Sequence, residues 1–180
     1  MATATLISLD QYLSTTYRPD CDYIDGELQE RTLGKFDHSN LQRILVGILF
    51  AKEIEWNVLG LPEQRMRTSA TRVRIPDVCI VFCGQPIEQI LTTPPLACIE
   101  ILSEGDTLRT TQPRLEDYRT FGVPNIWILD PSHREAYLYE NGAFRPSADT
   151  LTIPETPIEI DLPYLFKRLQ LFGTAARTIV

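Results

Sequence analysis

The chain has 180 residues, of which 43% are apolar and 23% are charged. These proportions are typical of a globular protein with one hydrophobic core, and they exclude a disordered chain and a collagen-like repeat. Its 17 Lys and Arg residues against 24 Asp and Glu residues give a net charge of −7. This excess of acid argues against a general nucleic-acid coat, because such binding depends on neutralising phosphates. We therefore expect any contact with DNA to be local.

Neither a membrane segment nor a metal-binding cysteine motif is indicated. The longest apolar stretches, 44–51 and 78–83, fall well short of the roughly 20 residues of a membrane-spanning helix. Residues 1–10 lack the basic start of a secretory signal, so we expect no membrane partner and a cytoplasmic location. The cysteines form no CxxC pair, and we interpret them as small buried hydrophobic residues rather than zinc ligands: Cys21, Cys79, Cys83 and Cys98.

The first predicted elements are a hairpin and a long helix. Residues 11–20 form a short polar stretch, and residues 22–30 alternate around Asp25-Gly26, a pair that suits the tight turn of a β-hairpin. From residue 38 to about residue 55, apolar side chains recur every three or four positions, as they do along the buried stripe of a helix. Asp37 precedes this stretch as a candidate N-cap.

The middle of the chain predicts several strands and one short helix. Residues 63–74 indicate two strands or one strand with an irregular return, and the apolar runs 78–82 and 96–102 are typical of strands covered on both faces. Pro113 suits the first turn of a helix that ends at Gly122. Residues 125–130 predict a third apolar strand.

The remaining residues predict another hairpin and an extension. Residues 135–139 and the turn at Asn141-Gly142 form the hairpin. The proline-rich tail contains a small amphipathic helix near 164–171, which we expect to pack on the core. No internal repeat is present, so residues 1–180 are interpreted as one α/β (α+β) domain. Its core spans about 15–142, and 143–180 form a C-terminal extension.

Two acidic residues stand beside or inside apolar strands. Asp77 precedes one strand, and Glu100 lies within the run Ala97 to Leu102. A carboxylate among such neighbours is costly to bury unless it meets a cation, a hydrogen-bond donor or a metal. Either these acids form salt bridges with arginines such as Arg74 or Arg114, or they meet across neighbouring strands and hold Mg²⁺ or Mn²⁺, which prefer oxygen ligands.

The ordered motifs of the chain resemble those of the PD-(D/E)XK nuclease superfamily, and within it the Uma-type restriction endonuclease family, which is abundant in cyanobacteria. The resemblance covers about residues 15–142. It rests on these segments, in chain order: Asp22 to Leu28, His38 at a helix start, Ile75 to Val78, Pro94-Pro95, Ile99 to Ser103, Leu115 to Tyr118 and Gly122 to Trp127.

The resemblance implies a restriction-endonuclease-like αβββαβ core with a mixed central sheet and an N-terminal hairpin. It also implies metal-dependent hydrolysis of DNA phosphodiester bonds, with Mg²⁺ or Mn²⁺ held by Asp77, Glu100 and the backbone carbonyl of Ile101. A cation at such a site polarises the phosphoryl oxygen and lowers the pKa of water. Because members of the family often assemble as homodimers, the resemblance implies DNA and a second copy of the chain as partners.

The chain departs from the family pattern at two positions. The family places a lysine on the helix after Glu100, where this sequence has Arg114, and no lysine occurs between Lys52 and Lys167. Arginine stays charged at any working pH and is a poor general base, although it can clamp a phosphate. Asp22 stands where the family usually has Glu, and we expect it to support the catalytic residues Asp77, Glu100 and Arg114.

Several lesser candidates have a structural alternative. Arg72 and Arg74, like Arg65 and Arg67 before them, are either local phosphate contacts or solvated surface residues. His38 is either a nucleic-acid contact near the site or a capping residue. Asp106 is better interpreted as a turn former than as a metal ligand. We interpret three further residues as structural: Trp127, Tyr118 and His133.

Two functions remain open at this point. The first is a metal-dependent endonuclease that uses Asp77 and Glu100, with Arg114 in place of the lysine. The second is a nuclease fold without catalysis, retained as a module that binds nucleic acid or protein. Carboxylates that share an open cleft favour the enzyme, whereas carboxylates closed by arginines favour the module.

Overall fold

The computed structural model describes residues 6–32, 34–86 and 88–173. Its largest sheet has six strands in the order β10-β9-β8-β7-β6-β3. Only β7 and β8 run parallel among these neighbours, so the sheet is mixed. The strands span Val58–Pro62 (β3), Val78–Phe82 (β6), Ala97–Ile101 (β7), Asn125–Asp130 (β8), Glu135–Glu140 (β9) and Ala143–Ser147 (β10).

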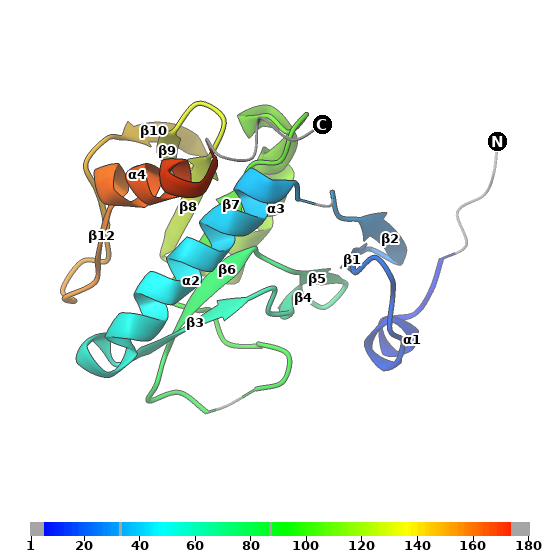
Figure 1. The fold of residues 1–180 in the computed structure, drawn as a ribbon. Coiled ribbons are helices and arrows are strands. Elements are labelled where there is room, and N and C mark those ends of the chain that lie inside the picture. Colours follow the sequence, from blue (N-terminus) through cyan, green and yellow to red (C-terminus); the bar gives the residue numbers. More distant parts are fainter. Residues whose placement is uncertain (1–5, 33, 87, 174–180) are drawn as a thin grey trace.

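Helices cover both faces of this sheet (Figure 1). On one face, α2 (Phe36–Trp56) and α4 (Leu162–Gly173) pack on alternate strand residues such as Val78 and Ile99. On the other face, α3 (Leu108–Phe121) packs on the intervening residues, among them Cys98. The order α2, β3, β6, β7, α3, β8 is the αβββαβ core that the resemblance implies.

A second sheet lies beside the core, at the edge where the chain begins (Figure 1). It has the order β2-β1-β5-β4 and carries the predicted hairpin, with Asp25 and Gly26 both at positive φ, 51° and 98°. Its strands span Cys21–Ile24 (β1), Glu27–Glu30 (β2), Met66–Ser69 (β4) and Arg72–Arg74 (β5), and a short helix, α1, spans Leu9–Ser14. A two-stranded sheet completes the fold with Thr150–Thr152 (β11) and Glu159–Asp161 (β12).

Several element boundaries differ from the sequence predictions. The polar stretch 11–20 contains most of α1, because Ser8 and Gln11 cap one another's backbone N–H groups. Helix α3 begins at Leu108, so Pro113 lies beyond the first turn in which it was predicted, because Thr107 and Thr110 form the same kind of cap. Pro113 therefore lies inside the helix, where it supplies no N–H to the helical ladder.

Other predictions were wrong in detail for equally local reasons. Helix α2 starts at Phe36 with Lys35 as its N-cap, so Asp37 lies in the first turn instead of capping it. Cys83 is exposed just beyond the end of β6, whereas the other three cysteines are buried. The extension also forms β10 to β12 before α4, and its apolar residues join the core under α2.

Within the described residues, no helix has the length and apolar character needed to cross a membrane.

Candidate active site

Backbone pairing brings Asp77 and Glu100 to the same place. Strands β6 and β7 are antiparallel, and Val78 pairs with Ile99. One step further along this register places Asp77 opposite Glu100, the position at which two side chains on one face can meet. Because Glu100 follows Cys98 by two residues, it lies on the α3 face of the sheet.

The Glu100 carboxylate is 2% exposed and is bound by two side chains of α3. Arg114 Nη1 donates to Oε2 at 2.6 Å, and the Tyr118 hydroxyl donates to Oε1 at 2.6 Å. Arg114 and Tyr118 are four residues apart and so share one face of the helix. Burial raises the pKa of Glu100, although the nearby charge of Arg114 opposes that shift.

The Asp77 carboxylate is also buried, and three groups surround it. Arg31 Nη2 donates to Oδ1 at 2.8 Å, and the Ile101 backbone N–H donates to Oδ2 at 2.7 Å. His38 Nε2, from the first turns of α2, lies 3.3 Å from Oδ2. Burial acts to raise the pKa of Asp77. The net shift is nevertheless downward, because that carboxylate is stabilised by the hydrogen bond and charge of His38, by the charge of Arg31 and by the Ile101 N–H.

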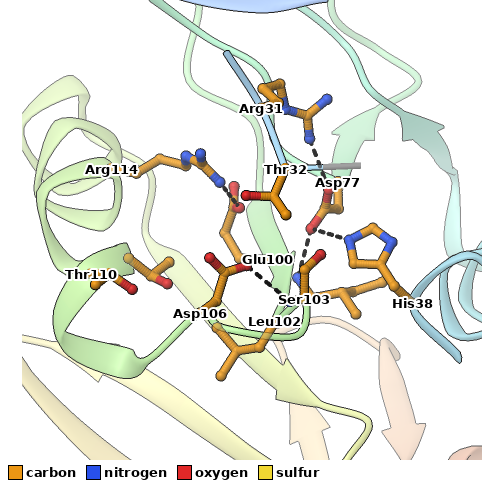
Figure 2. Close-up of a pocket in the computed structure, with 12 residues that line it drawn as sticks. Arg31, Thr32, His38, Asp77, Glu100, Leu102, Ser103, Asp106, Thr110 and Arg114 are labelled. Atoms are coloured by element: carbon orange, nitrogen blue, oxygen red, sulfur yellow. Dashed lines mark hydrogen bonds and ion pairs between the residues drawn. The ribbon is translucent and has the colours of Figure 1, made fainter. Parts of the chain in front are cut away.

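The two carboxylates line one small cavity of about 50 Å³ (Figure 2). Figure 2 shows Arg31 reaching Asp77 and Arg114 reaching Glu100 from separate segments of the chain. Polar side chains of the loop after β7 and of α3 complete the walls. The lining residues are Arg31, Thr32, His38, Asp77, Glu100, Ile101, Leu102, Ser103, Asp106, Thr110, Thr111 and Arg114.

A network of ion pairs adjoins the cavity at Arg114 and contains Asp22, the residue predicted to support the site. Asp22 is fully buried, and its Oδ2 accepts from Arg74 Nη1 at 2.8 Å and lies 3.5 Å from Arg114 Nε. Arg74 is 4% exposed and also donates to Asp117 Oδ2 at 2.7 Å. This burial places Arg74 in the interior, not on a surface open to nucleic acid. Arg72 is half-buried and pairs with Asp117 and Asp25.

Asp77 and Glu100 offer the oxygen ligands that Mg²⁺ or Mn²⁺ takes, so the chemistry of these side chains suits such a cation. In this arrangement, however, each of their four oxygens accepts a hydrogen bond, and both carboxylates are closed by arginines. Within the described part of the chain, no group of three or more His, Cys, Asp or Glu side chains is arranged to hold a metal. The sequence alternative named Arg74 or Arg114 as partners of these acids: Arg114 does pair with Glu100, but Asp77 pairs with Arg31.

The lesser candidates divide between the cavity and the rest of the molecule. Asp106 lines the cavity and also closes a turn, because its carboxylate accepts from the Ser103 N–H at 2.9 Å. Arg65 pairs with Asp20 and Arg67 is exposed, both outside the lining residues. His133 pairs with Asp130 beyond β8. Trp127 is buried in the core on the α2 face, as expected.

Sequence reasoning missed two residues of the site. Tyr118 is a core residue, as predicted, but its hydroxyl also holds Glu100. Its spacing of four residues from Arg114 was a signal that could have indicated this contact. Arg31 follows a hairpin strand with no motif around it, and only the three-dimensional structure brings it to Asp77.

Comparisons with known proteins identify the family of the chain and a solved structure of similar fold. The sequence model of the family described as "Uma2: Putative restriction endonuclease" matches residues 9–165. No curated protein matches the chain. The crystal structure of a "putative nuclease belonging to DUF820" from Anabaena variabilis is similar in fold, with a TM-score of 0.77 at 20% identity, over 91% of this chain and 99% of that one. A cryo-EM structure of a DrdV–DNA complex has a TM-score of 0.38 at 19% identity, over 69% of this chain and 11% of that one.

Proposed function

Since the chain belongs to the Uma2 family, we propose that it is an endonuclease that hydrolyses phosphodiester bonds of DNA with the help of Mg²⁺ or Mn²⁺. The observation that carries this proposal is the convergence of Asp77 and Glu100, from neighbouring strands, in one cavity with Arg114. Buried acids that lie side by side on one face of a sheet are costly to keep, which points to a role beyond packing.

Asp77, Glu100 and the carbonyl of Ile101 would hold the cation. When bound, a divalent cation polarises a phosphoryl oxygen and makes an attacking water more acidic. The guanidinium of Arg114 presents donors in a rigid fork that matches phosphate geometry, so it would orient the scissile phosphate and stabilise the negative charge that develops on it. Asp22 and Tyr118 would keep Arg114 and Glu100 in place.

The arginine pairs support a second candidate function, a nuclease fold that binds without catalysis. Arg31 and Arg114 already satisfy the buried charges of Asp77 and Glu100, which a purely structural site would require. This candidate predicts no binding of divalent ions in a calorimeter. It also predicts that Asp77→Ala changes stability alone.

A nicking assay on supercoiled plasmid DNA separates the two functions. The enzyme proposal predicts nicking by the wild type in Mn²⁺, no nicking in EDTA, and none by Asp77→Ala. Arg145→Gln is the matched control, because Arg145 is exposed and lies outside the cavity. Nicking that survives in Asp77→Ala would contradict the assignment of the site.

We also propose that two copies act together, since a pair of sites suits cleavage of both DNA strands. Linear plasmid formed together with the nicked form, and a dimer in sedimentation equilibrium, are the expected results. A monomer that only nicks would contradict the paired arrangement.

A further inference from the structure

We propose that Arg31 is an internal competitor of the divalent cation, and that it must leave Asp77 before Asp77 can act as a metal ligand. This inference rests on the proposed function, because it concerns how the same site becomes able to bind its cation. Arg31 Nη2 lies 2.8 Å from Asp77 Oδ1, and this side chain is 13% exposed against 6% for Asp77.

Charge makes the two cations mutually exclusive at Asp77. Arg31 is always protonated, and the low polarity of a buried site strengthens the repulsion between two positive charges a few ångströms apart. The guanidinium therefore satisfies the charge of Asp77 in the metal-free protein and opposes any second cation beside that carboxylate.

Arg31 is held less firmly than Arg114. The Nε atoms of Arg31 and Arg114 are both buried without a hydrogen-bond partner among the described residues, so the difference between the two arginines lies in their carboxylate partners. Its Nη1 lies 3.9 Å from Glu63 Oε1, and the Glu63 side chain is 61% exposed. Arg114, by contrast, lies on a helix and faces two buried carboxylates, Glu100 and Asp22. Arg31 is therefore the arginine that a cation can displace at the lower cost.

A path for that displacement lies next to the cavity. A larger groove of about 410 Å³ adjoins the cavity. The two share four lining residues, Arg31, Thr32, His38 and Asp77. Six further residues line the groove, including Gln42 and Glu63. Movement of the Arg31 side chain into this groove would free Asp77 Oδ1 and bring the guanidinium towards Glu63. The Ile101 N–H and His38 would remain beside Asp77 Oδ2.

Calorimetric titration of Mn²⁺ into the full chain, without DNA, tests the inference. Arg31→Gln removes the competing charge and should bind Mn²⁺ at least about tenfold more tightly than the wild type. Arg31→Lys keeps the charge and should stay close to the wild type, as should the exposed control Arg67→Gln. Equal or weaker binding by Arg31→Gln, including no binding by any variant, would overturn the inference.

Folding gives a second readout. If Arg31→Gln loses its structure without metal, Mn²⁺ should restore the native circular dichroism spectrum, because the cation takes over the charge of the arginine. A chain that stays unfolded at saturating Mn²⁺ overturns the inference.

The binding result and the cleavage result fail separately. Tighter Mn²⁺ binding by Arg31→Gln without any DNA cleavage would leave the role of Arg31 standing and count against the proposed hydrolysis. Cleavage by the wild type, with no change of Mn²⁺ affinity in Arg31→Gln, would support the proposed hydrolysis and overturn the role of Arg31.

Discussion

Arg114 donates a 2.6 Å hydrogen bond to Glu100 at the position to which the family resemblance assigns a lysine. Glu100 raises the pKa of Arg114 far above its ordinary value, so this side chain stays protonated and positively charged and does not release a proton. Arg114 can position and stabilise anions, but it cannot act as a general base. In the proposed hydrolysis, activation of water would therefore depend on Asp77 and on the groups that surround it.

Tyr118 is predicted to stabilise the fold through its hydroxyl group. Tyr118→Phe keeps the ring in the core and removes only the hydrogen bond to Glu100. Since a bond to a buried carboxylate is stronger than a neutral one, we expect the free energy of unfolding in urea to fall by about 1.5–3 kcal/mol. Tyr139→Phe is the control, because the Tyr139 hydroxyl donates to the exposed Glu116 at 3.1 Å and accepts only a long bond from Gln112 at 3.5 Å. An equal loss in both variants would contradict a special role for the Glu100 contact.

Arg74 is predicted to be the most important member of the ion-pair network for stability. Arg74→Gln would leave Asp22, which is fully buried, without its closest partner. Breaking a buried pair on one side costs about 3–5 kcal/mol, and we expect a loss of that size in urea unfolding. Arg145→Gln breaks only an exposed pair with Glu140 and should cost less than about 1 kcal/mol. Similar losses in both variants would show that the network adds little.

His38 is predicted to give the stability a pH dependence of definite sign. Burial acts to lower its pKa, but the hydrogen bond and charge of Asp77 raise it above the ordinary value of 6.5. A raised pKa in the folded state means that the protonated imidazole stabilises the fold. This contribution is complete below pH 6.5 and is lost as the pH rises through the pKa of the folded state.

Urea unfolding of the wild type and His38→Gln between about pH 5.5 and 8.5 checks this sign. The comparison of the two proteins is needed because the raised pKa of Glu100 affects the stability of both. The stability difference in favour of the wild type should be largest at the acidic end and shrink as the pH rises. A difference that grows with pH would contradict the His38–Asp77 pairing.

Much of the core could be predicted from the sequence because its signals are local. The hairpin at Asp25-Gly26 and the apolar runs of β6, β7 and β8 were predicted from turn chemistry and continuous hydrophobicity. The N-terminal caps of the helices were harder to predict. Thr107 begins α3 through reciprocal hydrogen bonds with Thr110, and any loop of similar composition could form such bonds. A proline inside the helix further obscured where α3 starts.

The acidic residues of the site could be predicted from the sequence, but the arginine that pairs with Asp77 could not. Asp77 and Glu100 stand out because carboxylates are rare within apolar strands, and the antiparallel register then brings them together. Arg31 comes from the end of a strand 46 residues before Asp77. No periodicity connects the two residues, so their contact depends on how the second sheet sits beside the first.

The rate of Mn²⁺-dependent plasmid nicking by Arg114→Lys, relative to the wild type, tests the central claim most directly. If Asp77 and Glu100 form a hydrolytic site in which Arg114 replaces an amine, lysine should raise the rate by about tenfold or more. That gain should disappear in the double variant Arg114→Lys with Asp77→Ala. No nicking by the wild type or by Arg114→Lys, in folded proteins and with duplex and single-stranded DNA, would contradict the claim.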